Sequence, residues 1–202
     1  GTTGPSIVVL DHVNAFSNLM FLNIDNGSRQ ALTASDVADG AIIDVGTGPL
    51  SMVVSPGANN SGKVFVAKQY SLASSGGVGE GEGSLVEYND TTGGQAILSG
   101  FSVGSNFIVK PTAMVRSADG NTIYMADSSR IWAMNISGGI GNATVELISS
   151  SSVSPNTLGS GPTFGSVTAM AIDPVRPVIY LAAGIKGVIA VNTNTGERTT
   201  LS

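Results

Sequence analysis

The stretch Gly187-Val-Ile-Ala-Val-Asn-Thr-Asn-Thr-Gly-Glu-Arg-Thr-Thr-Leu-Ser202 reads as an apolar strand, a small polar turn and a second strand ending in Leu-Ser. Three other segments repeat this pattern, at residues 19–33, 84–99 and 130–149. Recurrence at a spacing of roughly 50 residues indicates a repeat architecture, in which each copy is one supersecondary unit. This repeat decides the fold.

Further predicted strands lie upstream of each copy. Segments rich in Val, Ile and Tyr precede all four copies, at residues 6–11, 63–68, 121–127 and 177–183. Three copies carry an earlier strand centred on methionine, at residues 49–57, 111–120 and 166–174. Four antiparallel strands in roughly 40–50 residues are typical of a β-propeller blade. The sequence therefore predicts an all-β propeller with four-stranded antiparallel blades at residues 6–33, 49–99, 111–149 and 166–202.

The first copy is short, because too few residues precede it to form the methionine-centred strand. Residues 1–202 are thus expected to form part of a single propeller, with about three and three-quarter blades, whereas closed rings have roughly four to eight. Three explanations stay open: a piece of a longer ring, a ring completed or continued by a partner, and a self-contained open stack. A chain that starts at Gly1 without Met is expected to be processed or excised from something longer.

Composition excludes several classes of function. The chain has 202 residues, of which 42% are hydrophobic and 11% charged, which is ample for a core. A net charge of −5 and the lack of a Lys/Arg cluster disfavour nucleic acid as a partner. No apolar run approaches the roughly 18 residues of a membrane helix. The absence of cysteine excludes disulfides and thiolate metal sites.

Five Asn-x-Ser/Thr triplets are candidate N-glycosylation sites, at Asn26, Asn59, Asn89, Asn135 and Asn142. Chance occurrence in a chain rich in Asn, Ser and Thr is the simpler interpretation, and a secreted glycoprotein is the alternative. Low charge together with abundant Gly, Ser, Thr and Asn favours a secreted, extracellular or periplasmic protein.

The phrase Asp119-Gly-Asn-Thr-Ile-Tyr-Met-Ala-Asp127, followed by Arg130-Ile-Trp-Ala-Met-Asn135, resembles the blade repeat of NHL-type six-bladed propellers. The turn in 188–198 resembles that of YVTN and gluconolactonase-like propellers. This resemblance covers most of residues 7–202 and implies blade architecture. Such propellers range from protein-binding scaffolds to lactonases that hold a divalent metal with acidic and Asn side chains at the central channel. No position of this chain matches those ligands.

Ligands of propellers usually sit where the loops between second and third strands meet. The candidate ligand-face residues of this chain are Asp11, His12, Asn14, Lys68, Tyr70, Asp127, Arg130 and Lys186. His12 is the single histidine, so any histidine acid–base chemistry would need it. The simpler alternatives are a turn residue for His12 and a local turn or ion pair for Asp127 with Arg130.

Other motifs point to structure rather than chemistry. No Gly-x-Ser-x-Gly nucleophile elbow occurs. The loop containing Glu80 and Glu82 could bind calcium weakly, although it lacks the further oxygens that calcium needs. No other cofactor is predicted, and the sequence leaves open whether the chain binds a metal ion. The low-complexity segments 71–83 and 150–164 are expected to be mobile. Core positions between blades are expected for Trp132, Met52, Met114 and Met170.

The sequence favours a non-catalytic extracellular β-propeller module for protein binding or structural assembly, with no catalytic residue. Its partner is expected to be protein: further blades of a longer chain, or a neighbour in a homo-oligomer or filament. The alternative is a metal-dependent lactonase-like hydrolase with a site at the channel face.

Overall fold

The computed structural model describes residues 6–13, 16–32, 49–54, 63–69, 83–89, 95–99, 102–103, 106–107, 111–127, 129–151 and 158–201. This part of the chain is all-β, and its helical elements are two single-turn 3₁₀ helices, η1 (Ile140–Asn142) and η2 (Gly184–Lys186). Among these residues no helix has the length and apolar character needed to cross a membrane.

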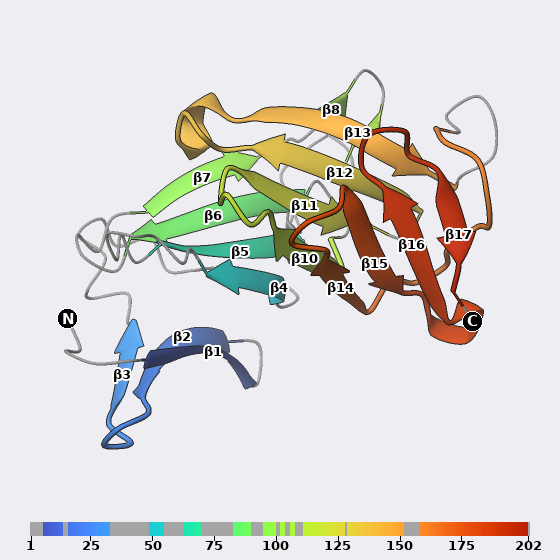
Figure 1. Cartoon of the computed structure of the whole chain (residues 1–202). Helices are drawn as coiled ribbons and strands as arrows, with labels where there is room; N and C mark the ends of the chain where they lie inside the picture. The colour runs from blue at the N-terminus through green and yellow to red at the C-terminus, as the bar shows by residue number, and fades with distance from the viewer. Residues whose placement is uncertain are drawn as a thin grey trace, which may run out of the picture.

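The strands form antiparallel sheets in which spatial order equals chain order (Figure 1). The first sheet has three strands, β1 (Ser6–Val13), β2 (Phe16–Asn23) and β3 (Arg29–Leu32). The second has β4 (Pro49–Val54), β5 (Lys63–Gln69), β6 (Gly83–Asn89) and β7 (Gln95–Ser99). The third has β10 (Ala113–Arg116), β11 (Thr122–Ala126), β12 (Arg130–Asn135) and β13 (Thr144–Ser150). The fourth has β14 (Ala169–Ile172), β15 (Val178–Ala182), β16 (Val188–Asn192) and β17 (Arg198–Thr200).

The sheets stand side by side with their first strands innermost. Strand β10 packs against β4 on one side and against β14 on the other, and β4 also contacts β1. Successive four-stranded sheets that meet along their inner strands are the arrangement of propeller blades. A small extra sheet of β8 (Ser102–Val103) and β9 (Asn106–Phe107), which the repeat pattern did not predict, lies next to β13.

Local turn chemistry explains where the strands end. A hairpin turn joins β10 and β11: the N–H of Gly120 donates to the carbonyl of Ser117, at 2.9 Å. Asp119 supports the turn by accepting the N–H of Asn121 at 3.0 Å. Gly120 has a φ of 75°, which a residue without a Cβ adopts at little cost.

The second and third sheets share one hydrophobic cluster, which we call the first junction. Phe65, Ala67 and Leu85 supply it from the second sheet. The third sheet contributes larger side chains, namely Met114, Ile123, Met125, Trp132 and Met134, each 6% exposed or less. The core positions predicted for Trp132 and Met114 are therefore confirmed.

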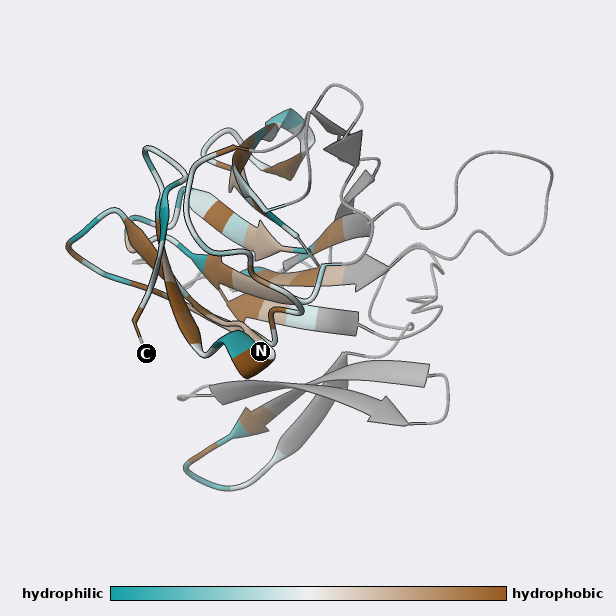
Figure 2. Cartoon of the chain, turned by 90° about the vertical axis from the view of Figure 1, so that its right-hand side faces the viewer, coloured by the Kyte–Doolittle hydropathy of each residue, from teal (hydrophilic) through white to brown (hydrophobic). Residues whose placement is uncertain are grey.

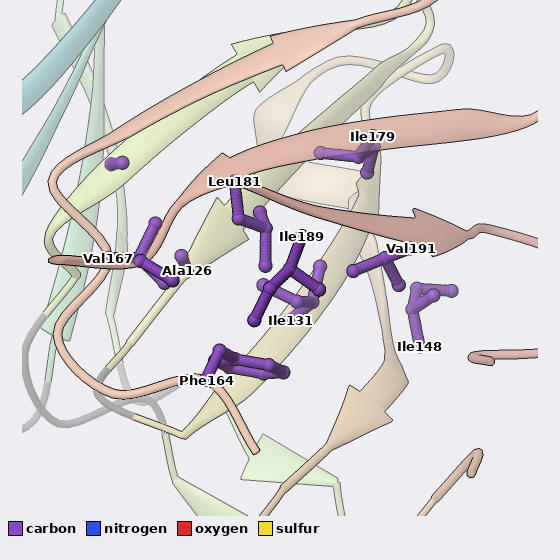
Figure 3. Close-up of a cluster of buried hydrophobic side chains, with 11 residues drawn as sticks. Ala126, Ile131, Ile148, Phe164, Val167, Ile179, Leu181, Ile189 and Val191 are labelled. Atoms are coloured by element: carbon purple, nitrogen blue, oxygen red, sulfur yellow. The ribbon is translucent and has the colours of Figure 1, made fainter. Parts of the chain in front are cut away.

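The third and fourth sheets share a second cluster, the second junction (Figure 3). Here the third sheet contributes Ala113, Ala126, Ile131 and Ile148. The fourth sheet contributes Ile179, Leu181, Ile189 and Val191, all fully buried, with Met170 packed at the margin. Alternate residues of β10, β11 and β12 thus contact two different neighbouring sheets, as the two-residue period of a β-strand allows.

Candidate functional site

In the described part of the chain, the predicted ligand-face residues lie in β1, β5 and β12, next to the end of β11, and in η2. Asp127 and Arg130 flank the β11–β12 turn, and Lys186 ends η2 between β15 and β16. Asp11, His12 and Lys68 lie within or near the ends of β1 and β5, where the structure describes the backbone. Asn14 and Tyr70 lie outside the described residues. The residues that the structure brings together from this set are Asp127 and Arg130.

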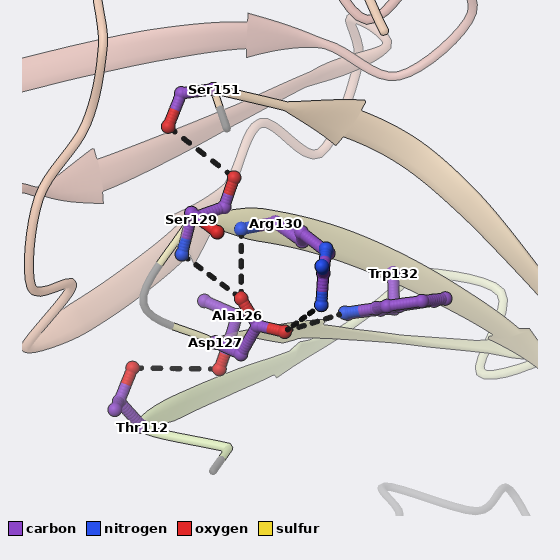
Figure 4. Close-up of polar contacts among 7 residues, drawn as sticks. All are labelled: Thr112, Ala126, Asp127, Ser129, Arg130, Trp132 and Ser151. Carbon is purple, nitrogen blue, oxygen red and sulfur yellow. Dashed lines mark hydrogen bonds and ion pairs between the residues drawn. The ribbon is translucent and has the colours of Figure 1, made fainter. Parts of the chain in front are cut away.

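Asp127 organises the β11–β12 turn, although its side chain is buried (Figure 4). Its Oδ1 accepts the backbone N–H groups of Ser129 and Arg130, each at 2.9 Å. Its Oδ2 accepts the indole N–H of Trp132 at 3.2 Å. A buried carboxylate with several donors is stabilised in place, so Asp127 is committed to holding the turn.

Arg130 completes this turn as an ion pair. Its Nη1 lies 3.7 Å from Oδ2 of Asp127, and its backbone oxygen accepts the N–H of Asp127 at 3.0 Å. The side chain of Arg130 is 21% exposed, against 5% for Asp127. The geometry therefore matches the predicted local turn and ion pair.

We expect Asp127→Ala to lower the free energy of unfolding by about 2 kcal/mol, because two turn N–H groups and the Trp132 indole lose their acceptor. Urea titration followed by fluorescence measures this loss, since Trp132 is the only tryptophan. The matched control is Asp119→Ala, because exposed Asp119 supports the β10–β11 turn with similar bonds. Equal losses of stability in the two variants would show that the buried contacts of Asp127 stabilise the fold no more than the exposed contacts of Asp119.

Lys186 lies in a connection that projects into solvent. The segment Gly184–Lys186 forms η2, with the N–H of Lys186 donating to the carbonyl of Ala183 at 3.1 Å. Lys186 and its neighbour Ile185 are exposed, the latter fully. The second-to-third-strand connection therefore presents a cation and an apolar side chain together in this sheet.

Arg198, at the start of β17, is a buried cation that the sequence analysis did not select. It is 6% exposed, and this burial lowers the pKa of its guanidinium below the ordinary value. The guanidinium donates at 2.7–3.1 Å to the hydroxyl of Ser149 and to the carbonyl oxygens of Ser150, Leu158 and Pro162. The partners are neutral oxygens, which together replace the water that a cation loses on burial.

The segment 158–164 is held against the sheets by this arginine. The backbone N–H of Arg198 donates to the carbonyl of Ser160 at 2.8 Å, and the guanidinium lies 5.9 Å from the ring centre of Phe164. Phe164 is itself 3% exposed. Residues 158–164 are part of the segment expected to be mobile, and in the structure the carbonyl groups of Leu158 and Pro162 accept bonds from this buried cation.

Among the described residues there is no group of three or more His, Asp or Glu side chains placed to hold a metal ion. Glu80 and Glu82, the candidate calcium ligands, lie outside the described residues. Of the candidate glycosylation sites, Asn26, Asn135 and Asn142 are exposed. Asn26 lies on the turn after β2, Asn135 ends β12, and Asn142 lies in η1 between β12 and β13. Asn89 ends β6, and Asn59 lies outside the described residues.

Among the residues that the structure describes, no other sheet packs on one face of the fourth sheet. We call it the open face and define it by Ala169, Ala171, Tyr180, Ala182, Val188 and Ala190. Ala169, Ala171 and Val188 are exposed, the last by 39%, and the others are half-buried. Figure 2 looks at the molecule from the side on which the fourth sheet lies. The open face contains no charged side chain.

The rim of the open face is polar. The hydroxyl of Tyr180 accepts a bond from Arg176 at 2.6 Å and donates to Asp173 at 3.1 Å. Bonds from the backbone and side chain of Arg176, and from the backbone of Val175, hold the pKa of Asp173 well below its usual range. An apolar centre with an ionised rim is the composition of many protein–protein contacts.

No family model matches the sequence, and no curated protein matches it. Solved structures do resemble it. PorZ, described as an essential surface component of the type-IX secretion system of Porphyromonas gingivalis, is 16% identical, with a TM-score of 0.52 over 96% of this chain and 25% of that one. The RRP9 WD40 repeats are 12% identical, with a TM-score of 0.47 over 75% of this chain and 37% of that one. A putative 6-phosphogluconolactonase from Bacteroides fragilis is 14% identical, with a TM-score of 0.46 over 100% of this chain and 68% of that one.

These likenesses concern the fold. This chain spans about a quarter of the length of PorZ and just over a third of the RRP9 chain. At such low identities a shared architecture says nothing of shared chemistry. The protein has a propeller-type all-β fold of antiparallel sheets, and membership of the NHL group stays a prediction.

Proposed function

We propose that this protein is a non-catalytic β-propeller module for protein interaction or assembly. The observation that carries the proposal is the open face of the fourth sheet. At the matching positions of the third sheet, Ala113 is 3% exposed and Ala126 is fully buried, because the fourth sheet covers them. In the described part of the chain, no sheet packs on their counterparts Ala169, which is exposed, and Ala182, which is half-buried.

The exposure of this face has a physical cost. Apolar surface left in water forgoes about 25 cal/mol per Å² of stabilisation, and the open face exposes Ala169, Ala171 and Val188. Contiguous apolar patches of this kind on soluble proteins usually mark sites of protein contact. A protein partner on the open face would recover that stabilisation.

The polar residues support a non-catalytic role. Asp127 is saturated by two turn N–H groups and an indole, and the guanidinium of Arg198 by carbonyl and hydroxyl oxygens. Both side chains act within the fold and offer no free group to a substrate. The competing lactonase interpretation stays a prediction that no contact of the described residues favours.

Two further parts of the proposal follow from the sequence. We propose that the blades occupy residues 6–33, 49–99, 111–149 and 166–202, and that further blades or a partner complete the ring. We also propose a secreted, extracellular or periplasmic location, in which the exposed Asn26, Asn135 and Asn142 could carry glycans.

Photo-cross-linking in the native source tests the interaction role. A photoreactive amino acid in place of Ala171 is expected to give a covalent adduct with protein, because this position lies on the open face. The matched control is the same substitution at Leu158, which is 41% exposed but lies on the segment beside β13. No adduct at position 171, or equal adducts at both positions, would contradict the proposed function.

A further inference from the structure

The turn between β2 and β3 places an asparagine next to a glycine at an exposed tip. Oδ1 of Asn23 accepts the N–H groups of Asp25 and Asn26 at 2.9 and 3.2 Å, and its carbonyl accepts the N–H of Gly27 at 2.9 Å. Oδ1 of Asn26 accepts the N–H of Ser28 at 2.8 Å. Asn26, Gly27 and Ser28 are all exposed to solvent.

The turn between β16 and β17 has the same bonds but a different residue before its glycine. Oδ1 of Asn192 accepts the N–H groups of Asn194 and Thr195 at 2.9 and 3.2 Å, and its carbonyl accepts the N–H of Gly196 at 2.8 Å. Oγ1 of Thr195 accepts the N–H of Glu197 at 3.3 Å, in the position of the asparagine oxygen of the first turn. Threonine can therefore occupy this position without loss of the turn.

Asn26-Gly27 is the only Asn-Gly pair in the sequence. The side-chain amide of an asparagine can be attacked at Cγ by the backbone nitrogen of the next residue, which closes a cyclic imide. A side chain on that next residue crowds the approach, and glycine has none. A Cβ built on Gly27 would meet nothing within 4 Å among the described residues. The attacking nitrogen is therefore open on that side.

The bond between Asn26 and Ser28 brings the reacting groups together. An asparagine oxygen that bonds to the backbone two residues ahead folds its side chain back over the intervening peptide, which here contains the nitrogen of Gly27. Holding two groups side by side removes much of the entropic cost of their meeting. The N–H of Ser28 also stabilises the negative charge that Oδ1 gains when Cγ is attacked.

One bond of the turn opposes the reaction. The N–H of Gly27 donates to the carbonyl of Asn23, and this bond has to open before the nitrogen can attack. Short exposed segments open at the lowest free-energy cost in a folded protein. The bond therefore slows the attack without preventing it.

We propose that Asn26 is a site of spontaneous deamidation in the folded protein. The nitrogen of Gly27 forms a bond to Cγ of Asn26, its proton passes to a base in the solvent, and Nδ2 leaves as ammonia. Water then opens the cyclic imide at either carbonyl, which gives aspartate or isoaspartate with no oxidation or reduction. This inference is independent of the proposed interaction role.

The products change the turn in two ways. Both add a carboxylate next to Asp25, in a chain whose net charge is already −5. Isoaspartate also inserts a methylene into the backbone before Gly27, which displaces the N–H of Gly27 from the carbonyl of Asn23. The hairpin of β2 and β3 is therefore expected to loosen as the protein ages.

Peptide mapping by mass spectrometry tests this site. The whole chain is produced without glycosylation, because a glycan on Nδ2 of Asn26 would block the reaction, and is kept folded in warm, mildly alkaline buffer. Asn26 is expected to deamidate at least about tenfold faster than Asn194, which corresponds to about 1.4 kcal/mol in the activation barrier. Asn194 is the internal control because it is exposed in the equivalent turn but precedes Thr195.

Two variants test the roles of the two residues. Asn26→Thr copies the equivalent position of the other turn, so it should abolish deamidation at this site while circular dichroism shows an unchanged fold. Gly27→Ala keeps the amide but adds a Cβ beside the attacking nitrogen, and should slow deamidation of Asn26 about tenfold.

Two outcomes would overturn the inference. One is an equal rate of deamidation at Asn26 and Asn194 in the folded chain. The other is deamidation of Asn26 in concentrated urea but not in the folded protein, because the turn would then protect the amide.

Discussion

Arg198→Ala is expected to lower the free energy of unfolding by about 3 kcal/mol, because bonds from a buried charge to several acceptors disappear at once. The carbonyl of Pro162 would lose its donor, and the carbonyl of Leu158 and the hydroxyl of Ser149 would each lose one of their bonds. The loss would be a large share of a typical domain's stability. Urea titration followed by circular dichroism and Trp132 fluorescence measures it.

Arg176→Ala is the matched control for this prediction. Arg176 also bonds to an acid and a hydroxyl, but its side chain is 67% exposed, so water replaces the lost partners. The loss of stability in Arg198→Lys should lie between the losses in the two alanine variants, because lysine keeps the charge but lacks the planar set of donors of arginine. If both alanine variants lost the same stability, the buried guanidinium would not be what holds segment 158–164.

Gly159→Ala is expected to destabilise the fold by about 4 kcal/mol, through backbone strain and steric overlap combined. Gly159 has a φ of 75°, and a Cβ built there would lie 2.0 Å from the carbonyl oxygen of Gly196. Backbone on both sides leaves no flexible side chain to move away. Thermal or urea unfolding measures the loss.

Gly27→Ala separates the cost of backbone strain from the cost of steric overlap. Gly27 has a similar φ of 68°, but a Cβ there meets nothing within 4 Å. This variant should lose only the cost of the left-handed backbone, about 1 kcal/mol. A Gly159→Ala variant no less stable than Gly27→Ala would show that segment 158–164 can move away from β17, contrary to the described contacts.

The all-β class and the succession of strands could be read from the sequence, because apolar alternation reports which strands are buried. The recurring methionine predicted the inner strands, and Met114 and Met170 do pack at successive junctions. The turn at Asp119-Gly120 likewise depends on local sequence, since every group that stabilises it lies within a few residues.

The role of Arg198 could not be predicted in this way. Its acceptors belong to segments 36 to 49 residues away, and they are mainly backbone oxygens, which every residue carries. The low complexity of residues 150–164 gave no sign that carbonyl groups of 158–162 accept bonds from Arg198. Among the candidate site residues, the Asp127–Arg130 turn followed from sequence because its contacts are local. Convergence of the other candidates depends on tertiary geometry that side-chain spacing does not encode.

In each sheet the strands are neighbours in space in the same order as in the chain, and this affects how the protein folds during synthesis. Each sheet is made from one uninterrupted piece of polypeptide, so it can close as soon as that piece leaves the ribosome, without waiting for distant sequence. Short-range pairing of this kind favours rapid folding. The sheets then stabilise one another through contacts between successive neighbours.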